Sequence, residues 1–235
     1  MPIPTGEGRI DPDRRDIALR DLKKEYEGLD EAVLAIREQV QSWEQDNPDK
    51  RTLVLVSGPT AGGKSTFVER MDFSPEDTTV LSLDRYYLEK DELEARDGKA
   101  NFSLPSALDT ERIRSDVQAF LSAKQREKVK VPIFDMRVSE RVGEEDIPVT
   151  RCLVIEGIYA LDQVDAETPF KVYIDVTEDT MLSRKLARDT AERGIPEDVV
   201  KERFEQNVRP ATREHVTTQR EKATIVIHND SEEKA

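Results

Sequence analysis

The chain is poor in the residues that build disulfides and transition-metal sites: among 235 residues there are one cysteine and two histidines. With a single cysteine, Cys152, no disulfide can form within the chain, and its apolar neighbours favour a buried structural thiol. Long hydrophobic runs are also missing, since none approaches the roughly 20 residues that a membrane-spanning helix needs. No secretory signal is recognisable. We therefore expect a soluble, cytoplasmic protein with no membrane partner.

Positive charge is in deficit as well. Asp and Glu number 50 against 36 Lys and Arg, which gives a net charge of -14 and a pI near 4.8. Such a balance argues against a general nucleic-acid surface, because phosphate backbones bind basic surfaces. A solvated acidic surface explains the excess, and a local basic pocket for a small anion remains compatible with it.

One glycine-rich stretch, residues 51–66, dominates what is present. Gly58, Gly63, Lys64 and Ser65 match G-x-x-x-x-G-K-[ST], after an apolar run at 53–56 that is typical of a buried parallel strand. Backbone N–H groups of such a loop cradle phosphate oxygens, the lysine reaches the β- and γ-phosphates, and the serine hydroxyl can ligate Mg²⁺. A chance glycine-rich turn is the alternative, which the preceding strand disfavours. The predicted cofactors are ATP and Mg²⁺, and the predicted cofactor-binding residues are Gly58, Pro59, Thr60, Ala61, Gly62, Gly63, Lys64, Ser65 and Thr66.

Further apolar runs predict four more strands, at 79–83, 152–155, 170–176 and 223–227. Asp84 follows the second strand and Glu156 the third. Ligands of an open parallel sheet bind beyond the carboxyl ends of its strands, so both carboxylates are expected near Lys64 and Ser65. We interpret Glu156 as a second contact to the magnesium shell. For Asp84, a role as a turn or helix-capping residue is the structural alternative.

Between the strands, the apolar spacing predicts helices at 110–123, 178–193 and about 197–207. Residues 89–105 read as polar and irregular, and residues 128–149 as a small antiparallel excursion that turns near Gly143. Arg184, Arg188 and Arg193 stand on the second of these helices. A solvated helix face would explain them, but a phosphoryl-transfer site also needs cations on the developing charge.

The N-terminal part differs from the rest. Residues 1 to about 12 read as a flexible lead-in, and from about Asp13 to Gln45 apolar residues recur at steps of three and four, which predicts a heptad-patterned helix. Its apolar seam is Leu19, Leu22, Tyr26, Leu29, Val33, Ile36, Val40 and Trp43. The seam suits self-association into a homo-oligomer and docking on the body equally well. We divide the chain into this extension, 1–50, and a phosphate-loop domain, 51–235.

Strands that alternate with helices after a phosphate loop predict an α/β fold. The expected architecture is a doubly wound, parallel, five-stranded sheet with a small antiparallel excursion and an N-terminal helical extension.

Beyond the phosphate loop, several segments resemble the uridine kinase and phosphoribulokinase group of P-loop kinases, and most closely its uridine–cytidine kinase members. These segments are L-S-L-D-R-Y-Y (81–87), N-F-S-L-P-S-A-L-D (101–109), V-P-I-F-D (131–135), V-I-E-G-I (154–158), the arginine-bearing segment 179–194 and R-P-A (209–211). The resemblance covers about residues 53–227. It implies that Asp84 activates the acceptor hydroxyl, that Arg184, Arg188 and Arg193 close over the transferring phosphoryl group with Lys64, and that the acceptor site includes Tyr87, Ser103, Phe134, Arg141 and Arg203.

Departures from the family pattern fall on the acceptor side. The positions that hold the pyrimidine nucleoside in the family are changed here to Ser103, Phe134, Ser139, Ile195 and Arg203. Each change removes or alters a hydrogen-bond partner, and sites built to pair polar groups discriminate strongly by them.

The sequence therefore predicts an ATP-dependent kinase acting on a small-molecule hydroxyl, with uridine or cytidine as the acceptor by resemblance. A pentose or sugar phosphate is the alternative acceptor. In a different class, the chain would be a non-catalytic ATP-binding switch or assembly protein, for which Asp84 and the cations of 178–193 would be unnecessary.

Overall fold

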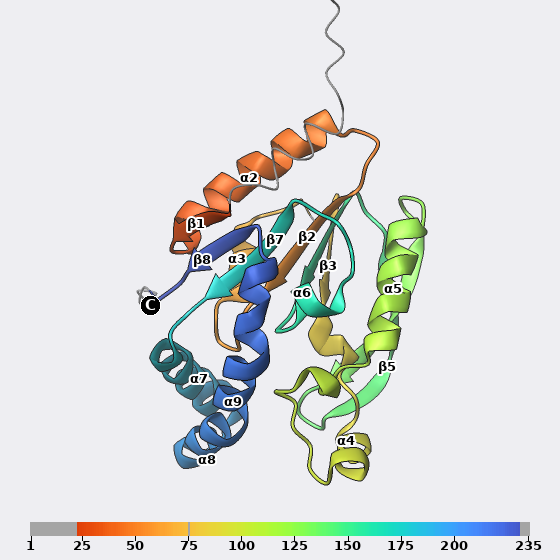
Figure 1. Ribbon diagram of the computed structural model, residues 1–235. Coiled ribbons are helices and arrows are strands. Elements are labelled where there is room, and N and C mark those ends of the chain that lie inside the picture. Colours follow the sequence, from red (N-terminus) through yellow and green to blue (C-terminus); the bar gives the residue numbers. More distant parts are fainter. Residues whose placement is uncertain (1–22, 75, 231–235) are drawn as a thin grey trace, which may run out of the picture.

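The computed structural model describes residues 23–74 and 76–230. At its centre lies a parallel sheet of six strands in the order β1-β8-β7-β2-β6-β3 (Figure 1). The strands are β1 (Lys24–Glu27), β2 (Thr52–Ser57), β3 (Thr78–Ser82), β6 (Cys152–Glu156), β7 (Phe170–Asp175) and β8 (Ile225–His228). The predicted doubly wound α/β architecture is confirmed, with one strand more than the five expected.

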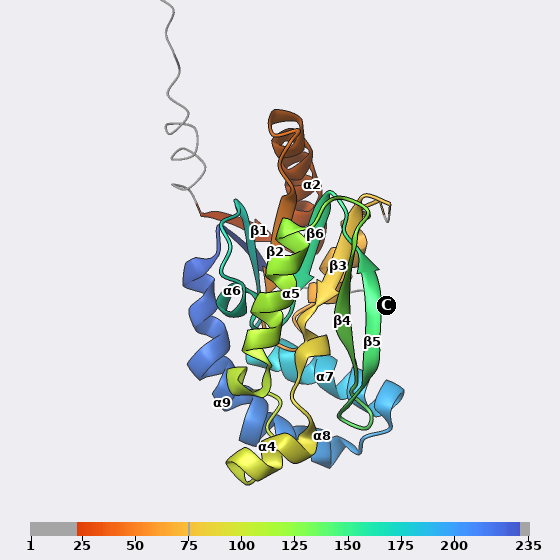
Figure 2. The same ribbon diagram turned by 90° about the vertical axis from the view of Figure 1, so that its right-hand side faces the viewer.

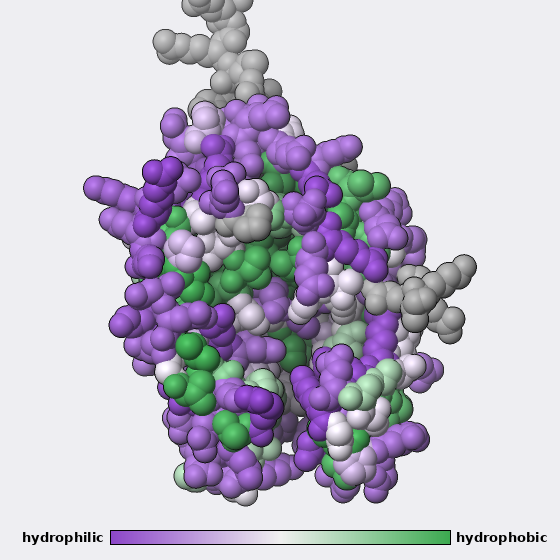
Figure 3. All heavy atoms as spheres, turned by 180° about the vertical axis from the view of Figure 1, so that it is seen from behind, coloured by the Kyte–Doolittle hydropathy of each residue, from purple (hydrophilic) through white to green (hydrophobic). Residues whose placement is uncertain are grey.

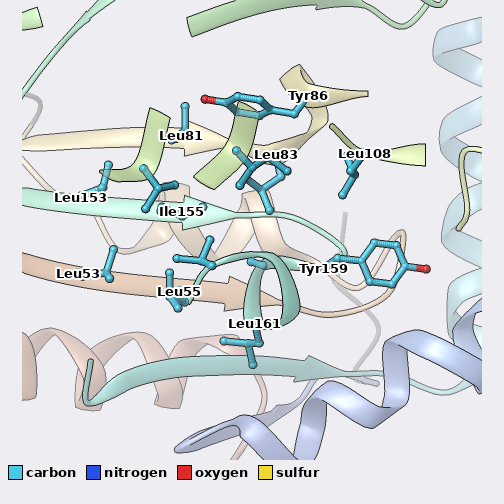
Figure 4. Close-up of a cluster of buried hydrophobic side chains, with 14 of the residues drawn as sticks. Leu53, Leu55, Leu81, Leu83, Tyr86, Leu108, Leu153, Ile155, Tyr159 and Leu161 are labelled. Atoms are coloured by element: carbon cyan, nitrogen blue, oxygen red, sulfur yellow. The ribbon is translucent and has the colours of Figure 1, made fainter. Parts of the chain in front are cut away.

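Helices cover both faces of this sheet, which explains why its strands are apolar on both sides. The helices are α2 (Leu29–Asp46), α3 (Lys64–Arg70), α4 (Lys90–Asp97), α5 (Thr110–Ser122), α6 (Ala160–Gln163), α7 (Glu178–Arg193), α8 (Glu197–Arg203) and α9 (Arg209–Ala211). Leu53 and Leu55 of β2 point to the side of α5 and α6, together with Leu81, Leu153 and Ile155 (Figure 4). The alternate residues, such as Val54 and Val154, belong to a second core with α2 and α3. The phosphate loop therefore leaves the middle of the sheet between two packed layers.

The N-terminal segment differs from the predicted continuous helix. Residues 24–27 form strand β1, which pairs in parallel with β8 so that Tyr26 lies opposite Ile227. Gly28 then adopts a φ of 82°, which ends the strand and lets α2 begin at Leu29. Leu19, Leu22, the lead-in 1–12 and the tail 231–235 lie outside the described residues.

Helix α2 packs on the body of the molecule. Leu29, Val33, Ile36 and Val40, four residues of the predicted seam, are buried against the second core, and Ile36 is 0% exposed. Of the two alternatives for the seam, docking is the one observed for these residues. Leu34, on the opposite side of the helix, is 65% exposed.

Two segments between β3 and β6 also differ from expectation. The stretch 89–105 is not wholly irregular, because Lys90–Asp97 forms α4, a polar helix that ends at Gly98 with a φ of 77°. The antiparallel pair β4 (Lys128–Asp135) and β5 (Glu140–Pro148) turns at residues 136–139, not near Gly143. Gly143 lies within β5, where the register shifts, so it marks an irregularity in the strand and not the turn.

The pair β4 and β5 lies beside β3 (Figure 2). Thr79 of β3 donates a hydrogen bond from its hydroxyl to the carbonyl of Pro148 at 2.6 Å, which ties the pair to the sheet.

Seen from behind, hydrophobic atoms gather in the middle of a largely hydrophilic surface (Figure 3). None of the helices within 23–74 and 76–230 combines the length and apolar character that crossing a bilayer requires.

Candidate active site

The predicted phosphate loop connects β2 to α3. Gly58 and Gly63 have φ angles of 148° and 95°, a region that side chains disfavour, so the path of the loop depends on glycine at both positions. A Cβ at Gly58 would also overlap the backbone oxygen of Ile174 in the neighbouring strand. Helix α3 begins with Lys64, and the first amides of a helix have no acceptor within it. The loop thus has backbone donors to offer to an anion.

Lys64 is folded over this loop. Its ammonium donates hydrogen bonds to the carbonyls of Gly58 at 3.0 Å and Pro59 at 2.9 Å. Burial lowers its pKa, the carboxylates of Glu156 and Asp84 oppose that shift, and Arg188 adds to it. Two acidic and two cationic residues of the predicted site therefore lie near enough to one another for charge to act on Lys64.

The two predicted carboxylates follow neighbouring strands. Asp84 lies in the short helical turn Leu83–Tyr86 after β3, and Glu156 is the last residue of β6, opposite Ser82. Asp84 keeps accessible surface because it borders a pocket, but the surrounding protein raises its pKa while Lys64, Arg188 and Arg193 oppose the rise. Burial likewise raises the pKa of Glu156, against the charge of Lys64. The carboxyl ends of β3 and β6 therefore bring both acids to the phosphate loop, as predicted.

The cations of α7 converge on Asp189, a residue that the sequence analysis did not single out. Asp189 is only 2% exposed and accepts a 2.5 Å bond from Lys185 and a 2.9 Å bond from Arg188, while Arg193 lies at 3.4 Å. Burial opposes ionisation of Asp189, but the hydrogen bonds and charges of Lys185 and Arg188 outweigh it and leave its pKa below the ordinary value. The signal available in the sequence was a single acidic residue with basic residues at i−4, i−1 and i+4 on the same predicted helix.

Lys185, Arg188 and Arg193 line a pocket of ≈ 150 Å³ that Asp84 and Thr60 also border. Its remaining wall is mostly apolar and comes from the segment after α4, the β4–β5 turn, the segment after β6 and the helical residues 204–222 that include α9. Those residues are Phe102, Met136, Ile158, Val208 and Val216, with Tyr87, Ser103 and Thr212 as polar members. The pocket thus places one carboxylate, three basic residues and a small, mostly apolar cavity beside the phosphate loop.

Three aromatic rings pack together at one side of this pocket. Tyr87 lies edge-on to Phe102 with ring centres 5.4 Å apart, and Phe134 is 5.8 Å from Tyr87. Ser103 borders the pocket, and its carbonyl accepts a 2.5 Å hydrogen bond from the hydroxyl of Tyr159. Phe134 therefore supports the wall through its neighbours and offers no polar atom to an acceptor.

Three predicted site residues lie elsewhere. Arg184 does not line the pocket, and its charge acts on Asp230 beyond β8. Arg141 is engaged by the protein, donating to Asp109 at 3.0 Å and to the Tyr87 carbonyl at 3.3 Å. Arg203 is exposed on α8 and does not border the pocket. Helical spacing alone did not reveal which cations of 178–203 face inward, and Lys185 takes the place expected for Arg184.

The chain matches a known family over most of its length. The sequence model of the Phosphoribulokinase / Uridine kinase family matches residues 53–235. A uridine kinase of Ureaplasma parvum is 29% identical over 188 residues, which cover 77% of this chain and 89% of that protein. A uridine kinase of Clostridium tetani is 29% identical over 181 residues, covering 74% of this chain and 85% of that protein.

Solved structures share the fold at lower identity. A chain from Silicibacter superposes with a TM-score of 0.63 at 22% identity, covering 83% of this chain and 98% of that one. The phosphoribulokinase of Rhodobacter spheroides gives a TM-score of 0.52 at 15% identity, covering 74% and 68%. The family match begins at residue 53, so β1 and α2 precede it.

Proposed function

Because the chain belongs to the Phosphoribulokinase / Uridine kinase family and is a kinase, we propose that it transfers the γ-phosphate of ATP to a hydroxyl of a small acceptor bound beside Asp84. One observation carries the proposal. Asp84 shares one pocket with Arg188 and Arg193 of α7 and with Thr60 of the phosphate loop, and the charges of Lys64 and Arg188 act on its carboxylate. A protein that only binds nucleotide needs no base and no cations at such a pocket.

On the nucleotide side, Lys64 and the loop amides hold the β- and γ-phosphates. Ser65 and Glu156 are the residues that would hold Mg²⁺, which neutralises phosphate charge when bound. One hydroxyl and one carboxylate suit this ion, because Mg²⁺ is usually bound by one or two carboxylates together with substrate phosphates and waters.

In the transfer step, Asp84 accepts the proton of the acceptor hydroxyl. The acceptor oxygen forms a bond to the γ-phosphorus as the bond from that phosphorus to the β,γ-bridging oxygen breaks, and ADP leaves with the electron pair. Arg188 and Arg193, with Lys185, stabilise the charge on the transferring group. Asp189 holds these cations toward the pocket. Catalysis of this kind consists mainly of positioning and charge stabilisation.

We further propose that the preferred acceptor is a sugar or polyol, with or without a phosphate, and that uridine and cytidine are poor acceptors. The pocket of ≈ 150 Å³ is small beside the roughly 300–1,000 Å³ of sites for larger ligands. Its wall includes the side chains of Phe102, Met136 and Val208, which offer no hydrogen bonds to the pyrimidine ring of a nucleoside. Arg203, a predicted acceptor-site residue, is exposed on α8 and does not border the pocket, so it is not part of this acceptor proposal.

Release of ADP tests both proposals. The protein is assayed with Mg²⁺ and ATP alone, then with uridine, cytidine, pentoses, hexoses and their phosphates. We expect acceptor-dependent ADP release, with kcat/KM for uridine below ~10⁴ M⁻¹s⁻¹, the lower end of ordinary enzyme efficiencies. Efficient uridine phosphorylation would contradict the acceptor assignment, and slow turnover that no hydroxyl compound stimulates would favour the switch or assembly class instead.

A further inference from the structure

Asn229 is a buried polar residue outside the sequence motifs, and it contacts the phosphate loop. It follows β8 directly and is 2% exposed. Its side-chain amide donates a hydrogen bond to the carbonyl of Gly62 at 2.9 Å. Its backbone N–H donates to the carbonyl of Asp175 at 2.8 Å, which fixes it to the end of β7. The buried side-chain amide of Asn229 is thus hydrogen-bonded to the loop just before Gly63 and Lys64.

The same point of the loop is contacted from the N-terminal extension. A Cβ at Gly63 would lie 2.6 Å from the amide nitrogen of Asn229 and 3.5 Å from a methyl group of Leu29. Leu29 is the first residue of α2 and is 2% exposed. The turn that leads into α3 is therefore enclosed on one side by Asn229 and Leu29.

Strand β1 connects these two contacts. It pairs with β8 along its whole length, and the N–H of Gly28 donates to the carbonyl of His228 at 2.7 Å. Leu29 and Asn229, which lie just beyond the ends of these two strands, are thereby held next to each other. Because the family match starts at residue 53, β1 and α2 are an addition to the part of the chain that carries the chemistry.

We propose that Asn229 and Leu29 are positioning residues for nucleotide binding, and that the extension β1–α2 is thereby a working part of the nucleotide site. By fixing the Gly62 carbonyl and packing on Gly63, they hold the loop in the shape that its amides and Lys64 need to meet phosphate oxygens. This inference rests on the proposed binding of ATP at the loop. It is independent of which acceptor is phosphorylated.

The first test compares the two ends of β8. Asn229→Leu keeps the size of the side chain but removes the donor to Gly62. Thr224→Val is the matched control, because the Thr224 hydroxyl donates to the Pro169 carbonyl at 2.7 Å just before the far end of the same strand. Isothermal titration calorimetry gives the Kd for ATP and for ADP, and steady-state kinetics give the acceptor KM.

We expect Asn229→Leu to weaken ATP and ADP binding by roughly 3- to 10-fold, as the loss of one hydrogen bond implies. The acceptor KM should stay within about twofold, since Gly62 and Gly63, the residues near Asn229, do not line the acceptor pocket. Thr224→Val should lower stability to urea yet leave both nucleotide affinities unchanged. Equal effects of the two variants on ATP binding would overturn the proposal, because the role of Asn229 would then be general stability.

The second test does not depend on Asn229→Leu folding. Leu29→Ala and Val40→Ala each shorten a buried side chain of α2, but only Leu29 reaches Gly63. We expect both to lower stability and only Leu29→Ala to raise the Kd for ATP, by roughly 2- to 5-fold. An unchanged Kd in Leu29→Ala would overturn the role of the extension. Failure of the wild-type protein to bind ATP is a different result, which would contradict the proposed function.

Discussion

Asp84 stands at the junction of the phosphate loop and the acceptor pocket, at the end of an edge strand. Asp84→Asn removes the proposed general base while keeping size and hydrogen-bonding capacity. We expect kcat to fall by ~10²-fold or more, with ATP affinity changed by no more than a few-fold. Asp91→Asn, an exposed change in α4, is the control. Near-normal turnover of the Asp84→Asn protein would remove this carboxylate from the mechanism.

The raised pKa of Asp84 gives that residue a signature in pH dependence. A base is active only when deprotonated, so a raised pKa moves the loss of activity on acidification to a higher pH than the roughly 3.9 of an ordinary aspartate. We expect log kcat to fall with unit slope below the raised pKa in the wild-type protein. The residual rate of the Asp84→Asn variant should lack that limb.

Asp189 illustrates how burial changes the contribution of an ion pair to the free energy of unfolding. Lys185–Asp189 and Lys201–Glu197 are both i, i+4 pairs at 2.5 Å, but the Asp189 side chain is 3% exposed and that of Glu197 is 63% exposed. Asp189→Asn should lower the free energy of unfolding by roughly 1.5–3 kcal/mol, because three cations lose their common partner. Glu197→Gln should cost less than ~0.5 kcal/mol.

The sign of the pH effect at Asp189 follows from its depressed pKa. A carboxyl whose pKa is lower in the folded state adds stability above its unfolded pKa, and that stability disappears as pH falls through the folded pKa. Urea unfolding measured between about pH 7 and pH 3 should therefore show the wild-type and Asp189→Asn proteins converging toward acid pH. A difference that is constant with pH would mean that charge at Asp189 is not what stabilises α7.

At the scale of elements, α2 is the part whose role the sequence left open. Ile36→Ala should lower the free energy of unfolding by about 2–5 kcal/mol, since this side chain is 0% exposed against the second core. Leu34→Ala, on the 65% exposed face of the same helix, should change it by less than ~0.5 kcal/mol. Light scattering should give one unchanged mass for both. A lower mass for Ile36→Ala would indicate that the seam joins two chains.

Elements were predictable where a buried run stood between polar residues, as at β2 and β6, or where a capping residue marked a boundary. Thr177 caps α7 and Gly194 ends it with a φ of 63°, at the predicted limits. The four-residue strand β1 offered no such run, and its Tyr26 happened to fit a helical spacing. Its structure comes from pairing with β8, a tertiary effect that local pattern cannot reveal. Gly143 shows a second limit, because glycine marks turns and strand irregularities alike.

For the whole molecule, nucleotide binding should be visible as global stability. The loop joins the central strand to α3, so a ligand that binds only the folded loop stabilises the entire fold. Free MgATP at 100 times its Kd should add about 2.7 kcal/mol and raise Tm. Lys64→Ala should reduce the shift, since it removes a cation from the phosphates. An equal shift in the Lys64→Ala protein would place ATP somewhere other than the loop.

The architecture and the phosphate side of the site were readable because loop chemistry and strand order together fix where Asp84 and Glu156 lie. The residues that line the acceptor pocket were harder to predict from the sequence. Whether Arg184, Lys185 or Arg203 faces the pocket depends on how α7 and α8 rotate against the body, and several basic residues on overlapping faces leave that rotation undetermined. Side chains such as Arg141, whose charge is matched by Asp109 within the protein, also resemble ligand-binding residues in sequence.

The pairing of β1 with β8 has a consequence for the order in which the protein matures. Glu25 and His228, which contact each other across these strands, are 203 positions apart in the chain. During synthesis the ribosome releases the phosphate loop long before Asn229, so the nascent loop lacks the amide that holds Gly62 until the last strand has emerged. Closing so distant a contact is slow compared with local helix formation. If Asn229 holds the loop as proposed, the growing chain becomes competent to bind nucleotide tightly only after β8 and Asn229 have emerged, when the residues of the acceptor pocket have also been made.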